Sequence, residues 1–367
     1  MLTSGSILVS FLWLVEQIPT PPPPAKRRRG RQETYSDKLV VKALIVMIIR
    51  RLYTAYALLY FLAQDDPVAR QIRPWLMEHG RFPTRRTWER RFATLPARLP
   101  ALIGCLGRHL VALLQPWAAQ GHAAAVDRTP LRANGGVWPK KHRLAGEVPH
   151  SSIDTEAAWS KSGYHGWWYG WKLHLAVVVG SVWIPLAAEF TIASDADNVV
   201  APKLLEQLPL AVRYVLGDTH YNTPELRAEC ALHNRELVAT RRGPYPHRDG
   251  GVEVRRSLHK LRSLAIEPFN GVFKNIFEWR GQMPVKGLKR CQLLALGAIF
   301  LYQIVLLYQY ERQQPIGVGI KPPFRTTHVS LSNFGVSIQS PLQRRSLCNT
   351  RTVLLSRHSP NRTARRS

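Results

Sequence analysis

The first third of the chain has the hydrophobic periodicity of helices. Between residues 37 and 118 apolar positions recur at helical spacing, and alternating β-type runs are scarce. Ser36 is expected to cap a helix that begins at Asp37. Breaks that carry Pro and cap-forming residues fall at 65–67, 79–83 and 95–100. We therefore predict an all-α region of about four or five helices over residues 37–118.

Short apolar runs of the strand type follow after residue 119. The predicted strands cover residues 167–180, 182–193, 213–218 and 235–240. Helix-type segments lie between and after them, as far as residue 312. This order predicts an α/β fold, in which helices flank a mixed sheet over residues 119–312 and an all-α region precedes it.

The two ends of the chain lack a sustained hydrophobic pattern. Residues 1–36 include the run TPPPPAKRRRGR, and we predict a flexible Pro/Arg-rich extension there. Residues 313–367 contain nine Lys and Arg and no acids, which predicts a disordered basic tail. Both ends could also arise from a misplaced start or a shifted reading frame.

Charge then narrows the class of partner. The 367 residues hold 51 Lys and Arg against 24 Asp and Glu, a net charge of +27, of which +18 remains without the tail. A charge of this size favours a polyanionic partner, with nucleic acid as the first expectation. The four Cys form no CxxC pair, so neither a disulfide scaffold nor a Cys-type zinc site is expected.

Two apolar stretches raise the question of a membrane. Residues 44–64 carry Arg50 and Arg51 near their middle, which argues against a span. Residues 293–308 are too short for a typical span and are better explained as a buried core helix. The N-terminal segment has no basic flank of the kind that signal peptides carry. We therefore predict a cytoplasmic protein that does not enter a membrane.

Three acids stand out because apolar residues precede each of them. They are Asp127 after AAAV, Asp218 after YVLG and Glu267 after LAI. An acid directly after a strand lies at the carboxyl end, where open α/β sheets bind ligands. Three carboxylates there would hold two divalent cations, with Mg²⁺ preferred by oxygen ligands and Mn²⁺ able to substitute. Taken singly, each acid is as well explained as a turn, cap or surface residue.

The flanks of these acids carry a resemblance. The segments AVDRTPL, YGWKLHLAVVVGSVWIPLAAEF, VLGDTHYNTPEL and IEPFNGVFK resemble the bacterial DDE insertion-sequence transposases with a short spacer before the glutamate. The likeness covers roughly residues 120–310. It implies a ribonuclease-H-like core, Asp127, Asp218 and Glu267 as catalytic metal ligands, Mg²⁺-dependent DNA cleavage and strand transfer, and a homodimer on double-stranded DNA.

Basic residues near the acids match the family in part. Lys172 matches its YG-x-K pattern and Lys274 its E-x6-K spacing, so the resemblance implies DNA contacts for both. The family's arginine four residues before the glutamate is Ser263 here, and Arg262 stands one residue away. Pro268 disfavours helix at Glu267, so we expect a helix to begin at Pro268 with Glu267 at its N-terminal edge. Arg262 could then take the arginine's role in DNA binding only if the chain bends there.

Other residues are weaker candidates. We expect DNA contacts from Arg85 and Arg86, in a recognition helix over 84–92, and from Arg241 and Arg242 in a basic loop. A solvated basic helix is the alternative for the first pair. Asp195 and Asp197 are expected in a strand–helix connection, His174 in the core, and Glu278 is a substitute third acid. His220 is either a contact of the site or an ordinary loop histidine. The Trp/Tyr run over 164–171 is expected to pack against its hairpin, with stacking on a displaced base as the alternative.

Two other functions stay open on the sequence. A related metal-dependent nuclease would cut without joining DNA ends. A catalytically inactive DNA-binding descendant of a transposase would do neither, and the displaced arginine leaves room for it.

Overall fold

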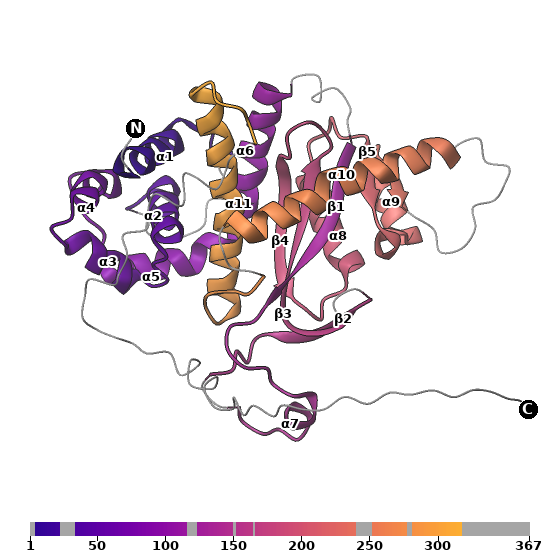
Figure 1. Cartoon of the computed structure of the whole chain (residues 1–367), viewed down its shortest axis with the longest axis horizontal. Helices are drawn as coiled ribbons and strands as arrows, with labels where there is room; N and C mark the ends of the chain where they lie inside the picture. Colours follow the sequence, from indigo (N-terminus) through magenta and orange to yellow (C-terminus); the bar gives the residue numbers. More distant parts are fainter. Residues whose placement is uncertain are drawn as a thin grey trace, which may run out of the picture. The chain divides into compact units, whose positions relative to one another are not determined.

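Six strands form one mixed sheet in the computed structural model, within the residues that it describes (Figure 1). These residues are 4–22, 34–115, 123–149, 152–163, 166–239, 252–276 and 281–317. The strands are β1 (Ala123–Arg132), β2 (Ala158–Ser162), β3 (Gly166–Val178), β4 (Pro185–Ile192), β5 (Tyr214–Gly217) and β6 (Glu236–Ala239). The α/β prediction, a mixed sheet flanked by helices and preceded by a helical region, is confirmed.

Strand β3 organises the sheet. It pairs antiparallel with β1 on one side and with β2 and then β4 on the other. On the far side of β1 lie β5 and β6, both parallel to it. The β1–β5 ladder covers only Ala123 to Ala125. Beyond that point β1 pairs with β3, and its last residue, Arg132, also forms an isolated parallel bridge to Gln282. Pro130 is tolerated there because one side of the strand needs no N–H donor.

Helices cover the sheet and continue into the N-terminal region. Those after β1 are α7 (Lys140–Leu144), α8 (Asp197–Gln207), the short η4 (Thr219–Tyr221), α9 (Pro224–Leu232), α10 (Val252–Ile276) and α11 (Leu288–Glu311). Those before it are α1 (Ser4–Gln17), α2 (Asp37–Arg50), α3 (Ala55–Ala63), α4 (Pro67–Ile72), η1 (Arg73–Leu76), α5 (Arg85–Thr94), η2 (Leu95–Ala97) and α6 (Leu99–Leu114).

Polar caps begin several of the N-terminal helices. The Ser36 side chain accepts a hydrogen bond from the backbone N–H of Leu39, which confirms the predicted cap. Thr54, Asp66 and Thr84 do the same for α3, α4 and α5. Each cap satisfies an N–H that the first helical turn leaves without a partner.

The apolar helix α11 joins the two regions. It packs against β4 on one side and against α1, α2, α5 and α6 on the other. It is long and apolar enough to cross a membrane, but 94% of its most apolar window is buried inside the protein. The α2–α3 and α5–α6 segments reach that length and apolar character only when the two helices of each pair are joined, and each pair is bent sharply at the break between its helices. Burial of α11 agrees with the core helix predicted over 293–308.

Two predictions about domain limits need correction. Residues 4–17, expected within a flexible extension, form α1, and Phe11, Leu12 and Val15 are fully buried. The helical region and the sheet, expected as separate domains that meet near residue 118, belong to one compact unit because α11 packs against both. The Pro/Arg-rich run over 23–33 and the tail beyond 317 lie outside the described residues.

Candidate active site

Asp127 and Asp218 lie side by side on neighbouring parallel strands. The ladder ends where Ala125 of β1 pairs with Leu216 of β5, and each acid follows two residues beyond that pair, close enough for their charges to interact. Parallel strands run about 4.8 Å apart, and residues at one level point to the same face. Asp218 follows the end of β5 as predicted. Asp127 does not end its strand, because pairing with β3 extends β1 to Arg132.

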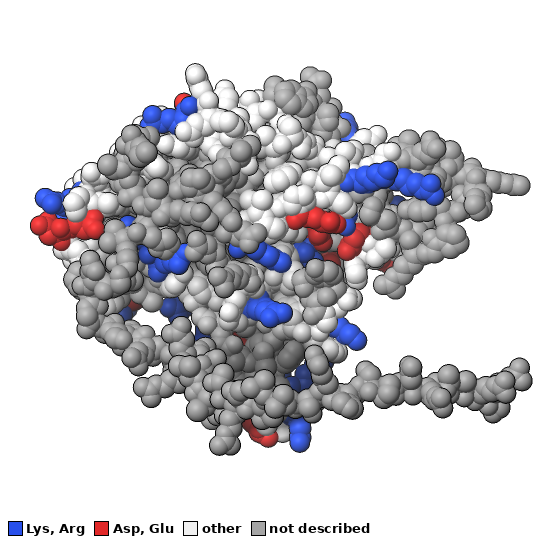
Figure 2. Space-filling model, viewed as in Figure 1, with Lys and Arg blue, Asp and Glu red and all other residues white. Residues whose placement is uncertain are grey.

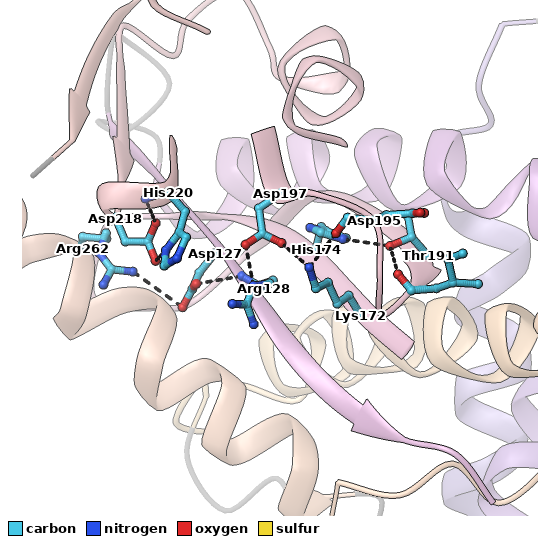
Figure 3. Close-up of polar contacts among 11 residues, drawn as sticks. Asp127, Arg128, Lys172, His174, Thr191, Asp195, Asp197, Asp218, His220 and Arg262 are labelled. Carbon is cyan, nitrogen blue, oxygen red and sulfur yellow. Dashed lines mark hydrogen bonds and ion pairs between the residues drawn. The ribbon is translucent and has the colours of Figure 1, made fainter. Parts of the chain in front are cut away.

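The pair differs in its exposure to solvent. The Asp127 side chain is 18% exposed and accepts a hydrogen bond of 2.8 Å from the backbone N–H of Arg128. Burial raises the pKa of Asp127 to about 6; the charge of Asp218 adds to this, and Arg262 opposes it. Asp218 is more open, caps η4 through the N–H of His220, and lies 3.2 Å from the Nδ1 of that histidine (Figure 3).

Arg262 of α10 lies between Asp127 and Glu267. Its Nη1 is 3.6 Å from Oδ2 of Asp127 and its Nη2 is 3.4 Å from Oε1 of Glu267. The Arg262 side chain is 9% exposed, whereas that of Glu267 is 58% exposed. Helix α10 continues through Pro268, so the predicted helix start at that residue is wrong. Arg262 reaches the acids from within an unbroken helix.

The donor set fits a divalent cation at Asp127 and Asp218. Two adjacent carboxylates, one of them largely buried, supply hard oxygen ligands whose mutual repulsion a cation relieves. Among the described residues no group of three His, Cys, Asp or Glu side chains is arranged to hold a metal. The Arg262 guanidinium stands between Glu267 and Asp127, so Glu267 can become a third metal ligand only if the guanidinium moves.

Lys172, predicted to contact DNA, is instead buried in a second ion cluster. Its Nζ donates to the Asp195 carbonyl at 2.6 Å and lies 3.0 Å from Oδ1 of Asp197. The other oxygen of Asp197 receives the Nε of Arg128 at 2.5 Å. We call Asp197, Arg128 and Lys172 the Asp197 cluster (Figure 3). Burial raises the pKa of Asp197, but the two cations outweigh it and the net shift is downward.

The Asp197 cluster was missed at the level of sequence. The sequence predicts a strand–helix connection at Asp197, and Asp197 does begin α8. Arg128 directly follows Asp127, so the cluster holds the residue next to the catalytic candidate. The signal available in the sequence was an acid at a helix start after a predicted strand, but its partners lie 69 and 25 residues away.

Tyr221 lies beneath the acids. Its side chain is fully buried, and its hydroxyl has no hydrogen-bond partner among the described residues. Burial, and then the charges of Asp127, Asp197 and Asp218, raise its pKa well above the ordinary value. The ring therefore stays neutral and supplies an apolar wall, which keeps the dielectric around Asp127 low.

The remaining predicted residues fall into three groups. His174 is a core residue as predicted: it contacts Thr191 at 3.1 Å, and burial lowers its pKa to about 4. Trp168, Tyr169 and Trp171 are buried in the hairpin, as expected of the aromatic run, whereas Trp167 is exposed. Arg241, Arg242, Tyr164 and Glu278 lie outside the described residues.

Lys274, Arg85 and Arg86 remain candidates for DNA contact. Burial lowers the pKa of Lys274 and the charge of Asp127 raises it, which places this half-buried amine near the acid pair. Arg85 and Arg86 are exposed in the first turn of α5, where Arg85 pairs with Glu89 at 2.8 Å. Arg262 is too buried for an open phosphate contact.

A mixed sheet flanked by helices and preceded by a helical region is consistent with the ribonuclease-H-like fold of transposases. The family model of the transposase DDE domain matches residues 120–304, half of the chain. The chain belongs to this family of transposases, whose members act on DNA in transposition and generally use divalent metals. No curated protein and no solved structure gives a match.

Proposed function

We propose that the protein cleaves DNA at insertion-sequence ends and joins the freed 3′-hydroxyl to target DNA. The observation that carries this proposal is the proximity of Asp127 and Asp218 just beyond the β1–β5 ladder, where their charges interact. The proposal includes two Mg²⁺ ions, replaceable by Mn²⁺, a homodimer on double-stranded DNA, and action in the cytoplasm without a membrane.

Asp127 and Asp218 would hold the metal, with Glu267 completing the site once Arg262 moves aside. Bound divalent ions activate the attacking oxygen and stabilise the leaving oxygen of an in-line displacement. Asp127 must be ionised to bind a cation, and its buried surroundings strengthen that interaction. Lys274, close to Asp127, positions a phosphate beside the pair.

The distribution of charge supports a DNA path across this site. Figure 2 shows acidic side chains gathered over α10 and the upper part of β1, with Lys and Arg on both sides of them. A backbone held by flanking cations would pass directly over the acids. Arg85, Arg86, Arg241 and Arg242 are proposed as further phosphate contacts.

The test is a cleavage and joining assay on the DNA that flanks the reading frame, with Mg²⁺ and with wild type beside Asp127→Ala. We expect cleavage at a defined end that disappears in the variant, and a joined product with target DNA. Cleavage without joining would instead identify a nuclease. Unchanged cleavage by Asp127→Ala would refute the assigned site.

A second candidate is a catalytically inactive DNA-binding descendant. The position of Arg262 between Asp127 and Glu267 favours it, because a guanidinium there neutralises the acids internally. This candidate predicts salt-sensitive DNA binding that Asp127→Ala leaves unchanged, and no cleavage by either protein.

A further inference from the structure

A groove separate from the acid pair lies where the N-terminal helices meet α11. It has a volume of about 660 Å³ and is lined by residues of α2, α3, α5 and the start of α11. Met47, Phe92, Leu293 and Leu294 are among the apolar residues that line it. This volume is within the usual range for sites that bind small molecules or single nucleotides, roughly 300–1,000 Å³.

The rim of the groove is basic. Lys289 and Arg290, in the first turn of α11, are exposed, and no described acid forms an ion pair with either. Arg85 stands on the opposite rim, and the acid Glu89 beside it is already paired with that arginine. The groove therefore carries excess positive charge above an apolar floor, which is complementary to an anion with an apolar body.

An exposed aromatic side chain completes the rim. Tyr56 lines the groove and is 61% exposed, with the Arg85 guanidinium 5.8 Å from the centre of its ring. Tyr60, one turn further along α3, stacks on Tyr56 but does not line the groove. Aromatic rings and guanidinium planes are the groups on which unpaired bases stack, at about 1–3 kcal/mol per base.

We propose that this groove binds a single-stranded segment of DNA, with bases against Tyr56 and the apolar floor and phosphates against Lys289, Arg290 and Arg85. A duplex presents phosphates and groove edges, so it would leave the floor of Met47, Phe92 and Leu293 uncovered. Unpaired bases can cover that floor. The inference rests on the proposed function in so far as that function supplies cleaved DNA ends, whose terminal bases can unpair.

The fold connects the groove to the acid pair. Strand β1 runs from Asp127 to Arg132, whose backbone N–H donates to the Gly281 carbonyl at 2.6 Å. The Met283 N–H donates to the Arg132 carbonyl at 2.8 Å, and α11 begins five residues later, at Leu288. Five strand residues separate Asp127 from Arg132, about 17 Å at 3.3 Å per residue. The acid pair and the start of α11, which lines the groove, are therefore linked through a short hydrogen-bonded stretch of backbone.

The experiment is equilibrium binding of a fluorescent oligothymidylate to the full chain, with a chelator present so that no cleavage occurs. Wild type is compared with Tyr56→Leu and with its matched control Tyr60→Leu, and Lys289→Gln with the exposed α8 control Lys203→Gln. We expect Tyr56→Leu to weaken binding roughly 5- to 100-fold, as loss of one stacked base implies. Lys289→Gln should reduce the slope of log affinity against log salt by about 0.7. Both controls should bind as wild type does.

Equal binding by Tyr56→Leu, Tyr60→Leu and wild type would overturn the proposal. A second result would also overturn it: Lys289→Gln weakens duplex binding as much as single-strand binding, while Tyr56→Leu weakens neither. The groove would then hold duplex phosphates. Far-ultraviolet circular dichroism and thermal melting verify that each variant is folded. Since binding is measured without metal, a failure of catalysis at Asp127 leaves this comparison intact.

Discussion

Two ion clusters meet at adjacent residues of β1, and the protein compensates the acid of one cluster with cations much more fully than the acid of the other. In the Asp197 cluster one acid receives two cations at 2.5 and 3.0 Å, and its pKa is lowered despite burial. Asp127 forms a longer ion pair, with Arg262 at 3.6 Å, and a second acid stands alongside. Burial outweighs the cations Arg262 and Arg128, and the pKa of Asp127 is raised to about 6. Adjacent residues, Asp127 and Arg128, belong to the two clusters.

The difference indicates which cluster is built for an external partner. A buried acid whose charge is fully compensated by the protein serves the fold, since removal of its partners would leave unpaired charge. An acid that the fold compensates poorly is a candidate functional group, because a cation from solution supplies what the protein does not. We therefore propose a structural role for Asp197 and a functional role for Asp127, and the variants below test each proposal.

The largest effect is expected for Asp127→Asn. Loss of a ligand charge should lower the Mg²⁺-dependent cleavage rate by about 10³-fold or more, since several kcal/mol of metal stabilisation are involved. The same variant should be more stable than wild type without metal. The difference between a pKa of about 6 and the ordinary 3.8 corresponds to roughly 3 kcal/mol, an upper limit for this gain.

The pH dependence of this gain in stability tests whether it comes from the ionised Asp127 carboxylate. The folded-state pKa of Asp127 lies above its unfolded value, so the ionised carboxylate destabilises the fold above pH about 6 and the cost disappears below pH about 4. Urea unfolding of both proteins at pH 4 and pH 7.5 measures this. A variant that is less stable than wild type at pH 7.5 would contradict the assignment of Asp127 as poorly compensated.

The next effect is expected for Asp197→Asn. It removes the shared charge of the cluster and leaves Arg128 and Lys172 buried without an acid, a change that typically costs about 3–5 kcal/mol. Asp195→Asn is the matched control, because Asp195 contacts Lys172 through its main-chain carbonyl. Thermal melting should show a large drop for Asp197→Asn and little change for the control. Equal melting temperatures would show that the cluster is not structural.

A smaller effect separates Lys172 from Lys274, which each match a different pattern of the family and differ in their surroundings. Lys172→Met should cost about 1–3 kcal/mol of stability and leave DNA affinity unchanged, since the amine is buried against Asp197. Lys274→Met should reduce the slope of log affinity against log salt by about 0.9, the value for one duplex phosphate. Titrations of duplex DNA at several salt concentrations measure both. A reduced slope for Lys172→Met would restore the DNA contact that the sequence implied.

Features that depend on a local sequence pattern could be predicted from the sequence, whereas features that depend on contacts between residues far apart in the chain could not. The Ser36 cap and the acid after β5 were predictable because the signals lie within a few residues of the effect. The apolar N-terminal segment was ambiguous until α11 and α4 packed against it. The sequence predicts a DNA-contacting Lys172 because the acid that pairs with this lysine lies 25 residues away. It predicts a strand that ends at Asp127 because the pairing with β3, which extends β1 to Arg132, involves residues far along the chain.

The smallest expected effect is that of Arg262→Gln, and it tests how poorly Asp127 is compensated. Arg262 lowers the pKa of Asp127, so its removal should move the acidic limb of the pH–rate profile to higher pH and leave the rate at alkaline pH less affected. Mn²⁺-dependent cleavage over pH 5 to 9 measures this, with the exposed Arg256→Gln of the same helix as control. An acidic limb that stays in place would mean that the guanidinium at 3.6 Å does not act on Asp127. A faster reaction at every pH would mean instead that Arg262 competes with the metal, and that α10 restrains the site it helps to form.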